Sequence, residues 1–172
     1  MKFSLFPALA IFAAAVTALA ADEKLTVGQF DFVMAAPWKK AENSGMMTKA
    51  VLNWPVEGGA PIEAKFYDFG GPSGGIEANI SRWLSQFEGK PEVKQEELTF
   101  GSTKVILLTA SGTYLDGAPM SPTKTPRPDY TLCGAILAGD QSNVFIKMTG
   151  PKAAMAKAQA DFKKLSTSPF AK

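Results

Sequence analysis

The feature that most constrains the fold is a series of short extended segments separated by turns rich in glycine and proline. In the clearest of them, residues 62–69 (IEAKFYDF), apolar side chains alternate with Glu63 and Lys65. A period of two is typical of a strand that buries one face. The segment before it, residues 47–54 (MTKAVLNW), is separated from it by PVEGGAP, whose paired glycines suit a turn between antiparallel strands.

Segments of the same kind occur along the rest of the chain. They are KLTV and FDFV near the start, EELTF and TKVILLTASGTYL around Gly101, and YTLCGAILA and NVFIKMTG around Gly139. Short turns join neighbouring segments except where a helix or a long loop intervenes. The sequence therefore predicts an α+β fold, an antiparallel sheet packed with two main helices, and residues 21–172 are expected to form a single domain.

Two segments have helical periodicity. Between Gly74 and Glu88, large apolar residues recur at i, i+4, i+7, i+8 and i+11, within about 100° on a helical wheel. The sequence Gly-Lys-Pro that begins at Gly89 is expected to end this helix. A second helix is expected to start at Pro151, because proline suits the first turn of a helix.

The first twenty residues are typical of a targeting segment. Lys2 precedes an apolar run, and Ala18-Leu19-Ala20 matches the small-x-small pattern for cleavage before Ala21. The alternative is an uncleaved membrane anchor, which needs about 20 apolar residues. No second hydrophobic span follows, so we expect an exported chain, periplasmic or extracellular, without a transmembrane span after cleavage.

Charge and composition disfavour several classes of function. Without Lys2 the chain has 17 basic and 16 acidic side chains and no basic block, which disfavours a nucleic-acid partner. The chain has no histidine and one cysteine, Cys133, so we expect no metal site and no cofactor. Cys133 lies among apolar residues and is expected to be a buried apolar side chain.

The segment DFGGPSGGIE (residues 68–77) contains a G-x-S-x-G motif around Ser73, as in the nucleophile elbow of hydrolases. An elbow serine needs a base, normally histidine, and this chain has none. A hydrolase that uses Ser73 with a lysine base is kept as a remote alternative. The favoured interpretation is a tight turn and helix cap, and no catalytic residue is assigned.

Two sets of residues are candidates for binding a ligand or a partner. Asn79, Arg82 and Gln86 lie at i, i+3 and i+7 on one border of the first predicted helix, beside Trp83. This row is suited to bind the polar groups of a ligand. The alternative is a structural border that forms hydrogen bonds with nearby backbone.

The second candidate is the proline-rich segment 115–130 (LDGAPMSPTKTPRPDY), which includes Arg127 and Tyr130. Its four prolines and their spacing predict an irregular loop with stretches of polyproline II. Loops of this length in compact domains are either functional or only mobile, and the sequence leaves both possibilities open.

The order of these elements resembles the PsbP-like and DcrB-like superfamily. The resemblance rests on the helix ANISRWLSQF, a strand that ends in GTY, the hairpin GAILAGDQSNVFIKMTGP and a final helix that ends in DFKKL. It is strongest to a set of secreted bacterial proteins that share the N-x-x-R-W-x-x-Q-F helix. The resemblance implies a sandwich of an antiparallel sheet between helices and a largely non-enzymatic role, and it carries no catalytic residues over.

Together these features predict an exported, non-enzymatic accessory or binding domain that docks on an envelope protein or assembly, with segment 115–130 as the expected contact. The alternative is a small-molecule-binding protein that uses the border formed by Asn79, Arg82 and Gln86. The sequence does not specify the oligomeric state.

Overall fold

A computed structural model describes residues 23–42, 45–70, 75–118 and 121–171. The predicted targeting segment lies outside the described residues. So does Ser73, with most of its glycine-rich loop.

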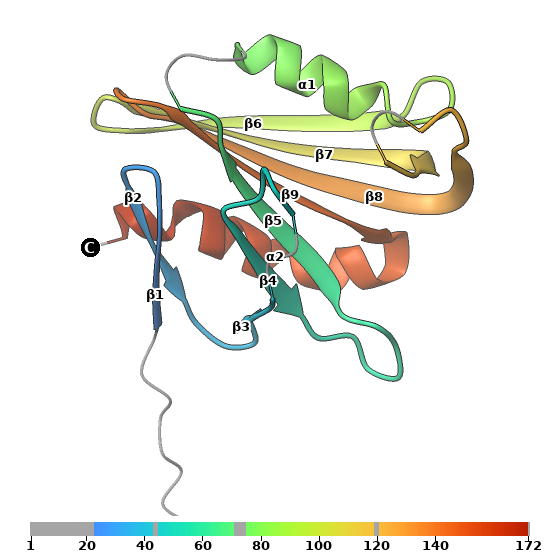
Figure 1. The fold of residues 1–172 in the computed structure, drawn as a ribbon, viewed down its shortest axis with the longest axis horizontal. Helices are drawn as coiled ribbons and strands as arrows, with labels where there is room; N and C mark the ends of the chain where they lie inside the picture. The colour runs from blue at the N-terminus through green and yellow to red at the C-terminus, as the bar shows by residue number, and fades with distance from the viewer. Residues whose placement is uncertain (1–22, 43–44, 71–74, 119–120, 172) are drawn as a thin grey trace, which may run out of the picture.

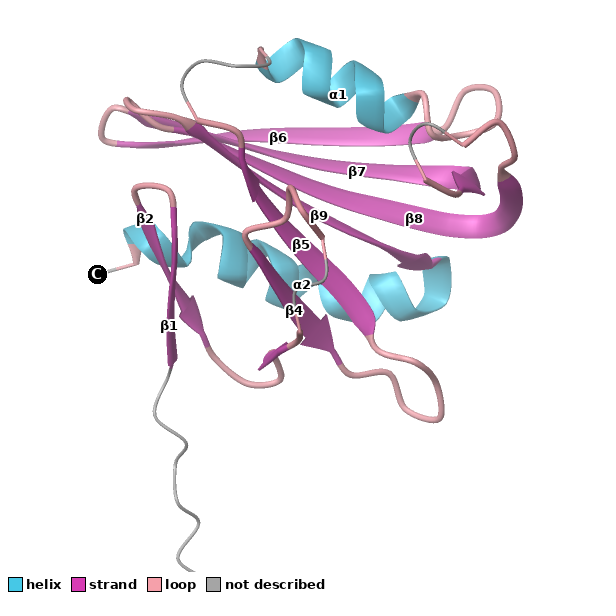
Figure 2. Cartoon of the chain, in the orientation of Figure 1, coloured by secondary structure: helices cyan, strands magenta, loops and turns pink. Residues whose placement is uncertain are grey.

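The main element is a seven-stranded antiparallel sheet (Figures 1 and 2), in which the strand order is β3-β4-β5-β9-β8-β7-β6. Its strands are β3 (Lys39–Lys40), β4 (Ala50–Trp54), β5 (Ile62–Asp68), β6 (Glu92–Phe100), β7 (Thr103–Asp116), β8 (Thr125–Ala138) and β9 (Asn143–Pro151). A separate hairpin is formed by β1 (Glu23–Val27) and β2 (Phe30–Met34). The predicted α+β fold is confirmed.

One helix packs on each face of the sheet, as Figure 1 shows. The helix α1 (Ile76–Leu84) covers one face, and α2 (Lys152–Thr167) covers the other. A short 3₁₀ helix, η1 (Ser168–Phe170), follows α2 and contacts β2. The helices in the described part of the chain are all too short or too polar to cross a membrane.

The central strands bury side chains on both faces. In β8, Cys133, Ala135 and Leu137 belong to the core beneath α2, whereas Leu132 and Ile136 belong to the core beneath α1. Cys133 is 2% exposed, as the sequence predicted. Because both faces of β8 are covered, its sequence is a continuous apolar run rather than an alternation of apolar and polar residues.

A glycine allows α1 to approach the sheet closely. A Cβ atom at Gly134 would lie 2.2 Å from Cζ3 of Trp83, so only glycine leaves room for the indole. Trp83 is 6% exposed, and its ring meets Phe145 edge-on at a centroid distance of 6.5 Å. The apolar stripe of this helix, which includes Trp83, is therefore the side that packs on the sheet.

The first helix is shorter than predicted and ends at Leu84 rather than at Glu88. Phe87 instead forms an isolated antiparallel bridge with Tyr114. The bridge is held by two backbone hydrogen bonds, from Glu88 N to Thr113 O (2.8 Å) and from Leu115 N to Gln86 O (2.7 Å). Phe87 fits the apolar period of the helix, but it lies in an extended segment. Its side chain is buried by this tertiary contact rather than by a further helical turn.

The prediction of an irregular loop over residues 115–130 is wrong for much of that segment. The strands β7 and β8 pair as far as Asp116 and Thr125, which leaves a connection of residues 117–124. Among the described residues, β9 ends opposite Tyr130, so nothing pairs with the other edge of β8 before that point. Proline lacks an amide hydrogen, and a strand edge that faces no neighbour tolerates it without loss of a ladder bond.

The start of β8 curls toward the α1 side of the sheet (Figure 1). Two backbone irregularities coincide with this bend. The register between β7 and β8 shifts between Gly112 and Tyr114, and Asp129 has a φ of 52°. A bulge adds twist and bends a strand pair, so this hairpin rises beside the end of α1.

Candidate functional site

A groove of about 940 Å³ lies on the α1 face of the sheet, beside the C-terminal end of that helix. Strands β5, β8 and β9 contribute Lys65, Tyr67, Tyr130, Lys147 and Thr149 to its lining. The end of α1, the β4–β5 loop and the β7–β8 hairpin contribute others, and Ala154 at the start of α2 also lines the groove. Those from the first three elements include Arg82, Ser85, Gln86, Val56, Gly59, Tyr114, Asp116 and Lys124. Segments that are far apart in the sequence therefore build one concave surface.

The groove exists because α1 covers only part of its face of the sheet. Phe145 lies in the core beneath the helix, and the next two residues on the same face of β9 are Lys147 and Thr149. On β5, Lys65 lies directly opposite Lys147. The helix has nine residues and ends at Leu84, so this polar part of the sheet stays uncovered.

Lys147 is the central polar residue of the groove. It is part-buried, and its ammonium donates hydrogen bonds to the Tyr114 hydroxyl (2.9 Å) and to Oε1 of Gln86. The ammonium also lies 5.3 Å from the centre of the Tyr114 ring, within the range of a cation–π contact. Within the described residues, no carboxylate forms an ion pair with Lys147.

The surroundings of Lys147 weaken its protonated form. Burial, and to a smaller extent the positive charge of Lys65, lower the pKa of Lys147 from 10.5 to about 8, against an opposing effect of Asp116. In contrast, a hydrogen bond with Glu63 raises the pKa of Lys65, and this ion pair measures 2.9 Å. The two lysines face each other on neighbouring strands, but Lys65 has an acidic partner, whereas the hydrogen-bond partners of Lys147 are neutral.

Aromatic rings fix the groups around Lys147. The Tyr114 ring stacks on Tyr130 at a centroid distance of 6.4 Å and meets Phe87 edge-on at 5.4 Å. The Tyr114 hydroxyl donates to Oε1 of Gln86 (2.8 Å), and burial raises the pKa of Tyr114, as it does that of Tyr67. The hydroxyls of Tyr114 and Tyr67 therefore stay protonated at physiological pH.

The structure brings some of the predicted binding residues into this groove. Arg82, Gln86 and Tyr130 line it. Asn79 does not, because its side chain is 3% exposed, donates to Gly75 O (3.2 Å) and accepts from Nη1 of Arg82 (3.1 Å). Trp83 belongs to the core beneath α1.

Arg127 is also outside the groove lining. It lies on the exposed part of β8, and its Nε atom is 3.4 Å from a carboxylate oxygen of Asp116. Its neighbour in the predicted loop, Tyr130, lines the groove because the bulge turns this end of the hairpin toward α1.

Four residues of the groove were not predicted as binding residues from the sequence: Lys147, Lys65, Tyr67 and Tyr114. A signal was present for Lys147, because it is the only charged residue within NVFIKMTG, a strand with paired neighbours on both sides. Burial of a lysine charge is unfavourable, so a lysine on the face of a central strand indicates a polar or functional site.

The groove offers ammonium, guanidinium, phenol and amide groups, which suit an anionic or polar ligand. Nowhere in the described ranges do three or more carboxylate, thiol or imidazole side chains come together as a metal site. Ser85, in the wall of the groove, donates its hydroxyl hydrogen to Arg82 O (2.9 Å) rather than to a side-chain base.

No protein-family model matches the chain. No curated protein matches it in sequence. The resemblance through the N-x-x-R-W-x-x-Q-F helix thus has no support from related sequences.

Two solved structures align with the chain. The solution structure of cyanobacterial PsbP (CyanoP) from Synechocystis sp. PCC 6803 aligns with a TM-score of 0.57 at 10% identity, over 91% of this chain and 96% of that chain. A crystal structure of PA94 from Pseudomonas aeruginosa aligns with a TM-score of 0.43 at 10% identity, over 83% and 92% of the two chains. The likeness to CyanoP shows that the chain has a PsbP-like fold.

Proposed function

We propose that this chain is an exported, non-enzymatic accessory or binding domain that docks on an envelope protein or assembly through the groove beside α1. The observation that carries the proposal is Lys147, a part-buried ammonium in a groove, which no described carboxylate neutralises. A charge in such a place costs folding free energy, and groups of this kind gather at binding sites.

A non-catalytic role fits the chemistry of the groove. The chain has no histidine, and the serine in the groove wall, Ser85, is bonded to a backbone carbonyl. Tyr114 and Lys147 instead form a connected set of hydrogen bonds with Gln86. Such a set positions hydrogen-bond donors for recognition of a ligand.

The proposal is tested by crosslinked pull-down of the tagged protein from its native envelope. Wild type is compared with Lys147→Met in the groove and with Lys163→Met on α2, which removes the same charge from the opposite side of the sheet. We expect one reproducible partner whose recovery falls with Lys147→Met and stays unchanged with Lys163→Met. Equal recovery with both variants would rule out the groove as the contact.

A second candidate function is the binding of a small molecule in the same groove. The observation in its favour is the volume of about 940 Å³, because ligand pockets commonly measure about 300–1,000 Å³. A ligand that binds the folded state raises the melting temperature by mass action. This candidate predicts a ligand-dependent rise that Arg82→Ala abolishes, and a library screen without any such ligand would argue against it.

A further inference from the structure

We infer that the groove binds a carboxylate group, which the Lys147 ammonium receives as a hydrogen-bonded ion pair. The inference rests on the proposed binding function and specifies the chemistry that the ligand presents. The carboxylate can belong to a free organic acid or to a polypeptide, as an acidic side chain or a C-terminus. Both sources offer Lys147 the same group.

The hydrogen bonds of Lys147 favour a single acceptor oxygen. An ammonium has three donors. Two of them bond to the Tyr114 hydroxyl and to Oε1 of Gln86, and both acceptors are neutral. Among the described residues no carboxylate pairs with Lys147, so one donor and most of the positive charge remain for the ligand.

The other charged side chains around the groove, three basic and two acidic, nearly balance one another. Glu63 already pairs with Lys65, and Arg82 bonds to Asn79, so these basic groups are partly engaged. Asp116 also lines the groove. The C-terminal end of α1, with its partial negative charge, faces the same space. One carboxylate therefore compensates for the charge of Lys147 without needing a second cation from the lining.

The body of the ligand would contact aromatic side chains. Tyr67, Tyr114 and Tyr130 line the groove close to the polar set. Rings that are held by stacking present an apolar face at little entropic cost. A carboxylate joined to a planar or apolar group therefore fits better than a small hydrophilic acid.

Phenylacetate is the first probe, and phenylacetamide is its neutral control with nearly the same shape. The readout is the NMR titration of the lysine side chains, labelled with ¹³C at Cε, in the full exported domain. We expect phenylacetate at about ten times its Kd to raise the pKa of Lys147 by about 1, because only the protonated lysine binds the anion. Phenylacetamide should leave it unchanged, and Lys163 serves as an internal control in the same spectra.

The pH dependence of binding must be separated from that of neighbouring groups. Those that face Lys147 are Glu63, Lys65 and Tyr67 on β5, Arg82 on α1, Tyr114 and Asp116 on β7, Tyr130 on β8 and Lys124 in the connection. Phenylacetate affinity should fall as the pH rises through the pKa of Lys147. Lys147→Met should weaken it about tenfold or more and remove this pH dependence, since one hydrogen bond to a charged group is lost.

The two sources are distinguished by a second arm. An acetylated peptide that carries aspartate beside phenylalanine is compared with its asparagine counterpart. Tighter binding of the aspartate peptide than of phenylacetate assigns the carboxylate to a polypeptide, and the reverse order assigns it to a free acid. The inference is overturned if the Lys147 signal responds to neither carboxylate, or responds equally to the amide controls.

Failure of the inference is distinguishable from failure of the proposed docking role. A partner whose capture depends on the groove, together with a Lys147 signal that ignores carboxylates, would leave the docking role intact and refute the carboxylate. The converse result is that Lys147 binds carboxylates but the Lys147→Met and Lys163→Met proteins recover the partner equally. This result would refute docking through the groove and leave the carboxylate inference intact.

Discussion

At the scale of single residues, Lys147 is held by neutral partners. Two acceptors of its ammonium, the Tyr114 hydroxyl and Oε1 of Gln86, carry no charge. Burial disfavours the protonated amine, which lowers the pKa of Lys147 from its ordinary 10.5 to about 8. The protonated lysine therefore destabilises the folded state relative to the neutral one.

This effect predicts an unusual dependence of stability on pH. Between about pH 8 and pH 10 the unfolded chain binds more protons than the folded one, so the free energy of unfolding should rise with pH, by at most about 1.4 kcal/mol per pH unit. Lys147→Met should lack this rise. The measurement is urea denaturation of both proteins between about pH 7.5 and pH 9.5, below the range in which tyrosines ionise. Parallel curves for the two proteins would contradict the assignment.

A second prediction concerns Cys133. The thiol is 2% exposed, and burial raises its pKa to about 11, so it is both inaccessible and protonated at neutral pH. We expect iodoacetamide to modify the native protein only as fast as the protein opens, and to modify it rapidly in denaturant. Fast labelling of the native protein, as for a free thiol, would show that this part of the core is open.

The sequence predicted the burial of Cys133 but not the importance of Lys147, and the difference is physical. Apolar neighbours on both sides of Cys133 specify its environment locally. The environment of Lys147 depends on where α1 ends and on the hairpin that carries Tyr114. Both depend on tertiary structure and not on the residues next to Lys147 in the sequence. Tyr130 was predicted as a binding residue within a loop. It lies in a strand and lines the groove beside a bulge that the sequence pattern did not reveal.

At the scale of elements, the packing of α1 on the sheet depends on one glycine. Gly134→Ala would place a Cβ atom 2.2 Å from the Trp83 ring, so the helix must shift. Overpacking of this kind destabilises by about 1–3 kcal/mol. Gly112→Ala is a matched strand control, because its Cβ would lie 3.5 Å from Phe87, an ordinary contact. Chemical denaturation should show a large loss for the first variant only, and equal losses would refute this account of the packing.

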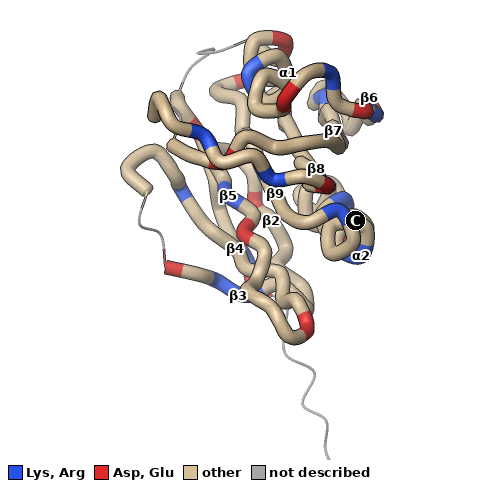
Figure 3. Tube along the Cα trace, turned by 90° about the vertical axis from the view of Figure 1, so that its right-hand side faces the viewer, with Lys and Arg blue, Asp and Glu red and all other residues tan. Residues whose placement is uncertain are grey.

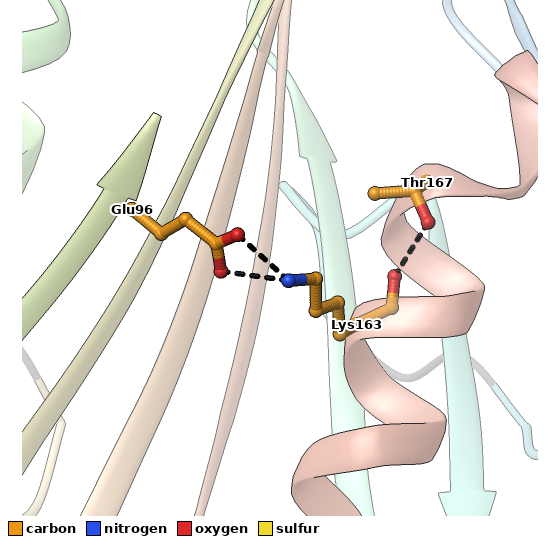
Figure 4. Close-up of polar contacts among 3 residues, drawn as sticks. All are labelled: Glu96, Lys163 and Thr167. Carbon is orange, nitrogen blue, oxygen red and sulfur yellow. Dashed lines mark hydrogen bonds and ion pairs between the residues drawn. The ribbon is translucent and has the colours of Figure 1, made fainter. Parts of the chain in front are cut away.

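The helix α2 is joined to the edge strand β6 by an ion pair (Figure 4). Nζ of Lys163 lies 2.7 and 2.8 Å from the two carboxylate oxygens of Glu96, while Thr167 donates to Lys163 O (2.9 Å). Both charged side chains are about half exposed. A double-mutant cycle of Glu96→Gln and Lys163→Met should give a coupling below about 1 kcal/mol. A larger coupling would mean that this contact is shielded from solvent, and Lys163→Met would then be an unsuitable control for the groove variants.

Alternation and turn residues predicted most of the strands, because both are local. The errors lie where a neighbour overrides the local pattern. Phe87 continued the helical period but pairs with Tyr114. Pro126 and Pro128 lie in the part of β8 whose far edge pairs with no described residue. No pattern within either segment contains this information.

At the scale of the whole molecule, positive and negative residues are interspersed along the elements rather than gathered in one block (Figure 3). This distribution agrees with the near balance of charge in the sequence. Specific attraction must therefore come from a shaped site instead of a general field. The groove has that character, since its lining comes from α1, the β7–β8 hairpin, the β4–β5 loop and the floor of the sheet.

The central claim is that this groove is where the protein contacts its envelope partner. The most direct measurement is site-specific photocrosslinking in the intact envelope, with p-benzoylphenylalanine in place of Ser85 in the groove wall or of Lys157 on the exposed side of α2. The account predicts one crosslinked partner from position 85, none from position 157, and loss of the crosslink when Lys147→Met is added. The same partner from both positions, or a crosslink from position 85 that is unaffected by Lys147→Met, would contradict it.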